Sequence, residues 1–173
     1  RPACRRRSGW WMPCAAGFAA EGSRFQPKTE RRTNKKSIRV LAATLFLAYG
    51  DMKKMESHAP AKGKLYKGTE PHGALLTTYV NNPALAAIKG KKGTMPAGAI
   101  VVKENYMPDK KLAAITVMYK VAGYNPEGGD WFWAKYTPDG KVEAEGKSGM
   151  ADMCIGCHGK AKGNDFLYTG ELK

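Results

Sequence analysis

The residues of this chain best suited to chemistry lie near its end, in the run Cys154-Ile155-Gly156-Cys157-His158. Thiols three positions apart on a helix share one side of it, and the adjacent imidazole offers a metal ligand. This spacing is typical of c-type haem attachment, in which the histidine binds the iron. We therefore predict one covalent haem c on Cys154 and Cys157, with His158 as the proximal iron ligand.

The same motif could instead form a zinc site or a local disulfide. A structural zinc site is normally four-coordinate, and beyond residue 50 only His58 and His72 remain as further His or Cys candidates. A bare disulfide would leave His158 without a role. A signal-like segment earlier in the chain also favours haem attachment, which we take as the leading interpretation.

The sequence indicates no clear second axial ligand for the iron, because no methionine follows His158. Met118 lies in an apolar run and is expected to fill the core. His72 precedes the first expected strand and is more readily interpreted as a turn residue, although histidine is a common metal ligand. The remaining candidates are His58, Met95, Met107, Met150 and Met153. We expect an open or weakly occupied distal position.

The first part of the chain differs from the rest in composition. All eight arginines lie between Arg1 and Arg39, whereas residues 51–173 contain eighteen lysines and no arginine. Residues 1–33, which include Cys4 and Cys14, show neither apolar periodicity nor a strand-like run. We interpret them as a non-native or disordered extension outside the working protein.

The next segment resembles an export signal. Residues 34–50 combine a basic start with an apolar stretch that is too short to cross a bilayer, which needs about 20 apolar residues. Small residues follow at Ala48 and Gly50, as near a cleavage site. The prediction is a signal peptide, a periplasmic or otherwise exported protein, and no membrane span once the signal is removed.

The charge of the remaining chain gives little support to nucleic-acid binding. The formal net charge of +14 falls to +5 for residues 51–173, with eighteen lysines against thirteen carboxylates. A mild lysine excess is usually a solvated surface, and it would also suit an acidic redox partner. Residues 51–68 are polar and lysine-rich, and we predict a flexible leader there.

The pattern from residue 69 to 173 predicts one α+β domain that is mainly β. Five runs rich in apolar, aromatic and β-branched residues are expected to form an antiparallel meander: 74–80, 99–104, 112–121, 131–136 and 142–145. Asn82 is expected to cap a short helix that ends before Gly90, and Ser148 to cap a closing helix. The haem would thus be attached on a C-terminal helix beside a five-stranded sheet.

Several segments together resemble the cytochrome P-460 family and the related β-sheet cytochromes c-prime. The likeness lies in residues 98–106 (GAIVVKENY), residues 125–136 (NPEGGDWFWAKY) and the terminal MCIGCH of residues 153–158. It extends over roughly residues 70–172. The resemblance implies a five-stranded antiparallel sheet with helices at its ends, a five-coordinate haem beside the sheet, and commonly a homodimer.

The resemblance also assigns a position to Lys103. In cytochrome P-460 a lysine of the matching Val-Lys-Glu segment is joined covalently to the haem edge, and Lys103 occupies that place. Hydroxylamine-oxidising members use a distal carboxylate and a pocket arginine. Residues 51–173 contain no arginine, so Glu104 or Glu127 would have to act as the proton acceptor.

Two functions follow as hypotheses. The first is a periplasmic mono-haem cytochrome that transfers electrons to a redox partner protein or binds nitric oxide or carbon monoxide at an open iron. The second is an oxidoreductase that oxidises hydroxylamine or nitric oxide, in which Lys103 tunes the haem and Glu104 handles protons. A haem module whose partner does the chemistry is a third interpretation.

Overall fold

The computed structural model describes residues 35–54, 65–68, 72–168 and 171–173. All of them belong to the compact unit Thr33–Lys173. The predicted extension at 1–33 therefore lies outside the described residues, as does His58.

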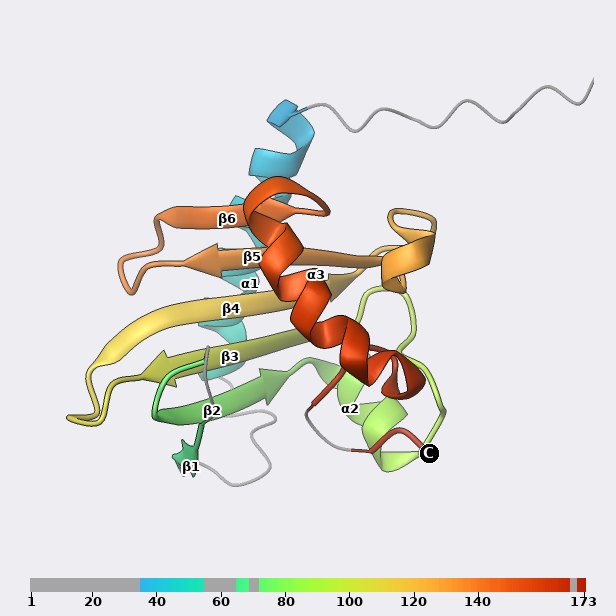
Figure 1. Ribbon diagram of the computed structural model, residues 1–173, viewed down its shortest axis with the longest axis horizontal. Coiled ribbons are helices and arrows are strands. Elements are labelled where there is room, and N and C mark those ends of the chain that lie inside the picture. The colour runs from blue at the N-terminus through green and yellow to red at the C-terminus, as the bar shows by residue number, and fades with distance from the viewer. Residues whose placement is uncertain (1–34, 55–64, 69–71, 169–170) are drawn as a thin grey trace, which may run out of the picture. The chain divides into compact units, whose positions relative to one another are not determined.

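A single antiparallel sheet forms the centre of the described chain, with its strands in sequence order (Figure 1). The predicted mainly β, α+β class is confirmed. The five predicted strands are present, and a two-residue edge strand precedes them. The strands are β1 (Tyr66–Lys67), β2 (Leu75–Val80), β3 (Ile100–Tyr106), β4 (Leu112–Lys120), β5 (Trp131–Tyr136) and β6 (Val142–Gly146).

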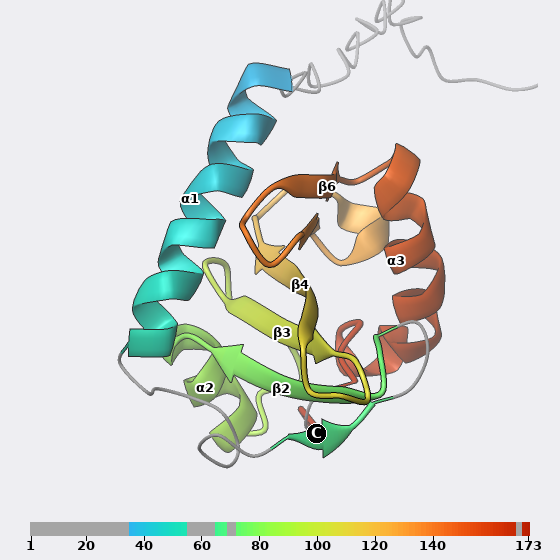
Figure 2. The ribbon, with the colours of Figure 1, turned by 90° about the vertical axis from the view of Figure 1, so that its left-hand side faces the viewer.

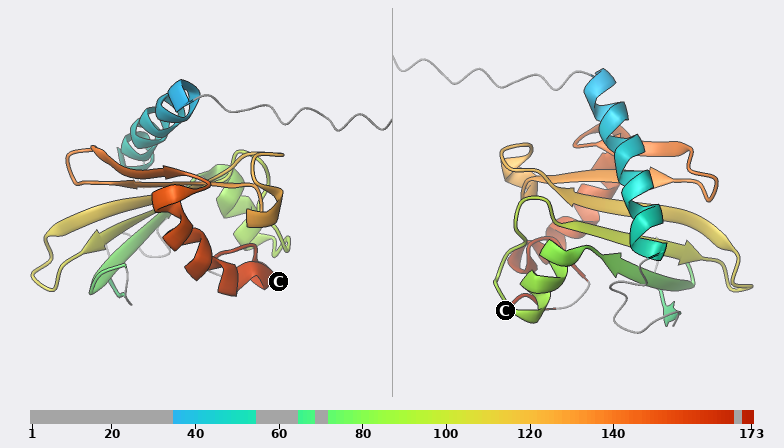
Figure 3. Two further views of the ribbon diagram at one scale, coloured as in Figure 1. Left: turned by 45° about the horizontal axis from the view of Figure 1, so that its top comes forward. Right: turned by 180° about the vertical axis from the view of Figure 1, so that it is seen from behind.

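The helices lie on both faces of this sheet. Helix α1 (Lys35–Lys54) and helix α3 (Asp152–His158) are on opposite sides, with the sheet seen between them in Figure 2 and α1 seen across the strands in the right panel of Figure 3. Helix α2 (Asn82–Lys89) connects β2 to the loop before β3. Three short 3-10 segments complete the chain: η1 (Pro126–Gly128), η2 (Gly149–Ala151) and η3 (Gly159–Asn164).

Two expected helix caps are corrected by the structure. The cap of α2 is Asn81 rather than Asn82, because the Asn81 side chain accepts the hydrogen bond from the Ala84 N–H. The Asn81 side chain also bonds to Gly98 and Ile100, which ties the helix start to β3. Ser148 makes no capping hydrogen bond. Instead, the Asp152 carboxylate accepts from the Gly149 N–H.

Strand alternation gives the sheet two buried faces. On one face, Val101, Met118 and Trp133 pack with residues of α2 and with the segment that follows α3. On the other face, Val102, Val117 and Phe132 pack against α1 through Ala42, Leu45 and Tyr49 of that helix. The Tyr136 hydroxyl reaches through this layer and donates to the Ala42 carbonyl at 2.6 Å.

A buried carboxylate lies on the α1 face. Glu104 is 1% exposed, and hydroxyl groups of Tyr49, Tyr79 and Tyr106 donate to its two oxygens. Burial, together with the charge and hydrogen bond of Glu104, raises the pKa of Tyr79 to about 12. The same causes raise the pKa of Tyr49 and of Tyr106. The tyrosines therefore stay protonated and act as donors near neutral pH.

Helix α1 overlaps two predicted segments. It contains residues 35–50 of the predicted signal peptide and continues through Lys54, while Tyr66–Lys67 pairs with β2. Parts of the predicted leader thus have regular structure. None of the helices in the described ranges, α1 included, has the length and hydropathy required to span a membrane. Removal of residues 1–50 from the exported protein stays a prediction.

Substitutions in the tyrosine cluster around Glu104 can test whether residues 1–50 are removed from the exported protein. Replacing Tyr106 by Phe removes one donor to a buried carboxylate, so the free energy of unfolding should fall by about 1.5 kcal/mol in urea titrations of the exported protein. Tyr49→Phe should leave the exported protein unchanged, because residue 49 would have been removed. An equal loss in Tyr49→Phe, with an N-terminal sequence that includes α1, would assign the helix to the working protein.

Candidate haem site

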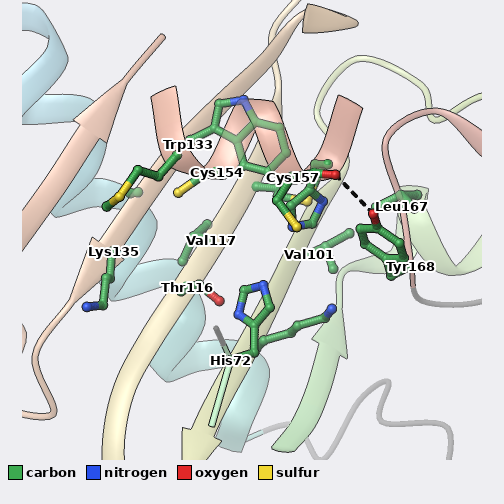
Figure 4. Close-up of a pocket in the computed structure, with 15 residues that line it drawn as sticks. His72, Val101, Thr116, Val117, Trp133, Lys135, Cys154, Cys157, Leu167 and Tyr168 are labelled. Atoms are coloured by element: carbon green, nitrogen blue, oxygen red, sulfur yellow. Dashed lines mark hydrogen bonds between the residues drawn. The ribbon is translucent and has the colours of Figure 1, made fainter. Parts of the chain in front are cut away.

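A cleft on the α3 face of the sheet gathers the predicted site residues. It contains about 900 Å³ of empty space, including its open mouth. Figure 4 shows it between the strands and the helix that carries Cys154 and Cys157. Its floor consists of two cross-strand rows, Val101–Met118–Trp133 and Lys103–Thr116–Lys135.

Helix α3 brings the three motif residues to the cleft together. Both cysteines are free thiols of intermediate exposure, and both line the cleft with His158. Burial raises the pKa of the Cys154 thiol. The disulfide interpretation is not supported by this arrangement.

The zinc interpretation also finds no support in the described part of the chain. No group of three or more His, Cys, Asp or Glu side chains there is arranged to hold a metal ion.

His158 is held in one orientation. Its Nδ1 lies 2.7 Å from the Phe166 carbonyl oxygen, which can only accept, so Nδ1 carries the proton and Nε2 keeps a free lone pair. Trp133 and Tyr168 flank the ring, with centroid distances of 4.7 and 5.2 Å. Burial is the main cause that lowers the pKa of His158 to about 4. A neutral imidazole with a free Nε2 is what a proximal haem ligand requires.

The loop that supplies the Phe166 carbonyl is fixed by an ion pair between Lys120 and Asp165, whose side chains are only 11% and 8% exposed. Asp165 and Phe166 both have positive φ, 52° and 66°, a backbone conformation that residues other than glycine rarely adopt. The Asp165 carboxylate accepts from Lys120 Nζ at 2.6 and 2.8 Å and from the Met95 N–H at 2.7 Å. Trp131 Nε1 donates to the Asp165 carbonyl at 2.9 Å. The sequence pattern gave no sign of this network, because its residues lie far apart in the chain.

Lys103, to which the family resemblance assigns a position at the haem edge, lines the cleft. Burial lowers the pKa of Lys103, and the nearby Cys157 opposes that shift. Lys103 and Cys157 therefore line the same cleft. The position of Lys103 at a haem edge, and any bond to it, stays a prediction.

Glu104 is not part of the cleft, which corrects its predicted catalytic role. Alternation along β3 sends Glu104 to the opposite face of the sheet, where it binds the three tyrosine hydroxyls. Glu127 is exposed in η1 and does not line the cleft either. None of the described residues lining this cleft is an Asp or a Glu.

His72 lines the cleft, which its position in the sequence did not indicate. It was expected to be a turn residue, and it does precede β2, but its ring lines the cleft. The His72 and His158 rings have centroids 5.9 Å apart and planes at 89°. Burial is the main cause that lowers the pKa of His72, and Lys103 adds to the shift.

The donor set and the lining fit a haem. Two thiols and one oriented imidazole lie on a single short helix, and the cleft walls are largely apolar. Lys103 and Lys135 on the cleft floor could bind the carboxylate groups of such a cofactor. Cys154 and Cys157 would hold such a group, and His158 would bind its iron.

The ion pair between Lys120 and Asp165 is expected to contribute to the stability of the fold. Lys120→Met leaves the Asp165 carboxylate without its cation, and we expect the free energy of unfolding to fall by about 3 kcal/mol in urea titrations. The control is Lys111→Met, which breaks a surface pair with Asp109 whose side chains are 83% and 54% exposed, and which should leave stability unchanged. Equal stability of the two variants would contradict the role given to Lys120.

Comparison with known proteins agrees with this site. No curated protein matches the chain. The sequence model of the family described as Cytochrome P460 matches residues 48–169, well over half of the chain and all three residues of the attachment motif. The chain therefore belongs to the cytochrome P460 family and is, as such, a haem-binding cytochrome.

Proposed function

We propose that this protein is a periplasmic mono-haem c-type cytochrome that transfers electrons and binds a small neutral ligand on the distal side of its iron. The observation that carries the proposal is the arrangement of α3, in which both thiols and the imidazole of His158 border one cleft. When bound, the haem supplies redox chemistry and an iron coordination position.

The cleft favours small neutral ligands over charged ones. Val101, Met118, Trp133 and Leu167 are among the residues that line it, and no described lining residue is a carboxylate. Apolar surroundings admit nitric oxide or carbon monoxide at little desolvation cost, whereas a cation would lose its hydration there without a carboxylate to replace it and would be repelled by Lys103 and Lys135. This is the chemistry of a diatomic-binding cytochrome.

Electron transfer requires that a partner come close to the haem. Met150 and Met153 are 63% and 71% exposed, and Met153 lies next to the attachment residue Cys154. Exposed methionines form adaptable contact surfaces. Together with the lysine excess of residues 51–173, they suit a redox partner protein with an acidic surface.

The homodimer implied by the resemblance is part of the proposal. In the described chain α1 covers Val102, Ile115, Val117 and Phe132. Removal of α1 with the signal peptide would uncover this apolar face, and a second copy of the chain would bury it again.

The second candidate function is oxidation of hydroxylamine or nitric oxide with Lys103 joined to the haem. It is favoured by one observation, the position of Lys103 in the cleft beside Cys157. It lacks a carboxylate to accept protons, because Glu104 and Glu127 lie elsewhere. The binding and electron-transfer function is therefore the better supported of the two.

Covalent attachment can be tested by mass. Protein exported from cells with working cytochrome c maturation should carry one added haem that survives acid denaturation. Replacing Cys154 or Cys157 by Ser should weaken attachment, while His158→Ala should leave attachment in place and remove the proximal ligand. Recovery of the bare polypeptide from such cells would rule out the proposal.

The two candidate functions are separated by Lys103→Ala. For the favoured function, the absorption spectrum of the dithionite-reduced protein should be the same with and without the substitution. A displaced ferrous band that disappears in Lys103→Ala would instead establish the cross-link and favour the oxidoreductase. Lys135→Ala removes the lysine of the same cross-strand row and serves as the matched control.

A further inference from the structure

A second histidine faces the proximal one across the cleft. The ring centroids of His72 and His158 are 5.9 Å apart, and their planes are nearly perpendicular at 89°. Two imidazoles bound on opposite sides of one metal ion have centroids about 6 Å apart, because each metal–nitrogen bond is about 2 Å long and each ring centre lies about 1 Å beyond its nitrogen. In Figure 4 the His72 ring points into the space below Cys157, between Thr116 and Val101.

The hydrogen bonds of His72 select the tautomer that a ligand needs. Its Nδ1 lies 3.1 Å from Asn105 Oδ1. Asn105 Nδ2 lies 3.1 Å from the Lys103 carbonyl and 3.2 Å from the Ala114 carbonyl, both acceptors, so the amide must turn its oxygen to His72. His72 Nδ1 therefore donates, and Nε2 keeps its lone pair.

This arrangement repeats that of His158, whose Nδ1 donates to the Phe166 carbonyl. Histidines that bind metals almost always donate their other N–H to a carbonyl or carboxylate, which fixes the ring and raises its basicity. Asn105 is 4% exposed and anchored to two strands, so it is a rigid acceptor for His72.

The backbone also brings His72 close to β3. Gly73 has φ of +83°, and a Cβ there would lie 2.9 Å from the Tyr106 carbonyl oxygen. Glycine thus permits the close approach that sets His72 beside Asn105.

We propose that this chain departs from the five-coordinate haem that the family resemblance implies: His72 is the sixth ligand of the haem iron, bound through Nε2 and displaced when a small ligand binds. The coordinate bond uses the lone pair of a neutral ring and releases no proton. Carbon monoxide or nitric oxide must then compete with His72 for the ferrous iron, so the histidine sets ligand affinity and rate. This inference rests on the proposed haem-binding function.

The spin state of the exported ferric holoprotein tests the inference. Electron paramagnetic resonance and near-infrared magnetic circular dichroism should show a six-coordinate, low-spin, bis-histidine iron. His72→Ala should become high-spin, and added imidazole should restore the low-spin spectrum. His58→Ala removes the other histidine outside the motif and should change nothing.

Ligand binding gives a second measurement. Carbon monoxide should bind ferrous His72→Ala at least about tenfold faster than the unsubstituted protein, whose rate should level off at high carbon monoxide as histidine release becomes limiting. His72→Phe, which keeps an aromatic ring in the cleft, should behave like His72→Ala.

The outcomes distinguish this inference from the function on which it rests. Attached haem with a purely high-spin ferric spectrum in the unsubstituted protein would overturn the assignment of His72 and leave the haem-binding function intact. A low-spin spectrum that survives in His72→Ala would assign the ligand to another residue. Absence of attached haem would instead overturn the proposed function itself.

Discussion

Successive side chains of a β-strand point to opposite faces of the sheet, and the cleft depends on this alternation in β3, β4 and β5. In β3, Val101 and Lys103 face the cleft, while Val102 and Glu104 face α1. A shift of one residue in this strand would put a carboxylate in the cleft and a lysine among the tyrosines. Register is therefore what gives the two adjacent charged residues different surroundings.

The second requirement is a fixed loop behind His158. Positive φ at Asp165 and Phe166 costs on the order of 1–3 kcal/mol for each residue. The ion pair with Lys120 and the hydrogen bond from Trp131 offset this cost and hold the loop in place. The Phe166 carbonyl can then accept from His158 without a rearrangement when the imidazole binds a metal.

Much of the fold could be predicted from local patterns. Five strands, the helix after β2 and helix α3 follow from apolar runs and from turn residues that act over a few positions. The cap at Asn81 was misplaced by one position, because two adjacent asparagines can cap equally well in a sequence. The roles of His72 and Glu104 depend on which face of the sheet meets α3, and no local sequence pattern indicates which face this is.

Within the site, the motif and Lys103 could be named from sequence and resemblance, whereas the supporting residues could not. Asp165 contacts Lys120 from 45 positions away, and His72 meets Asn105 from 33 positions away. Such pairs arise only when the sheet brings distant segments together. The tyrosines around Glu104 likewise come from a helix and two strands.

The order of elements along the chain has a consequence for biosynthesis. From β2 to β6, every strand pairs with the strand that precedes it in the sequence, and helix α3 follows them all. During synthesis, all six strands have thus emerged before Cys154 and Cys157 do. Pairing between sequence neighbours also keeps the loops to be closed short. The strands that line the cleft therefore need no contribution from the Cys154–His158 motif in order to pair.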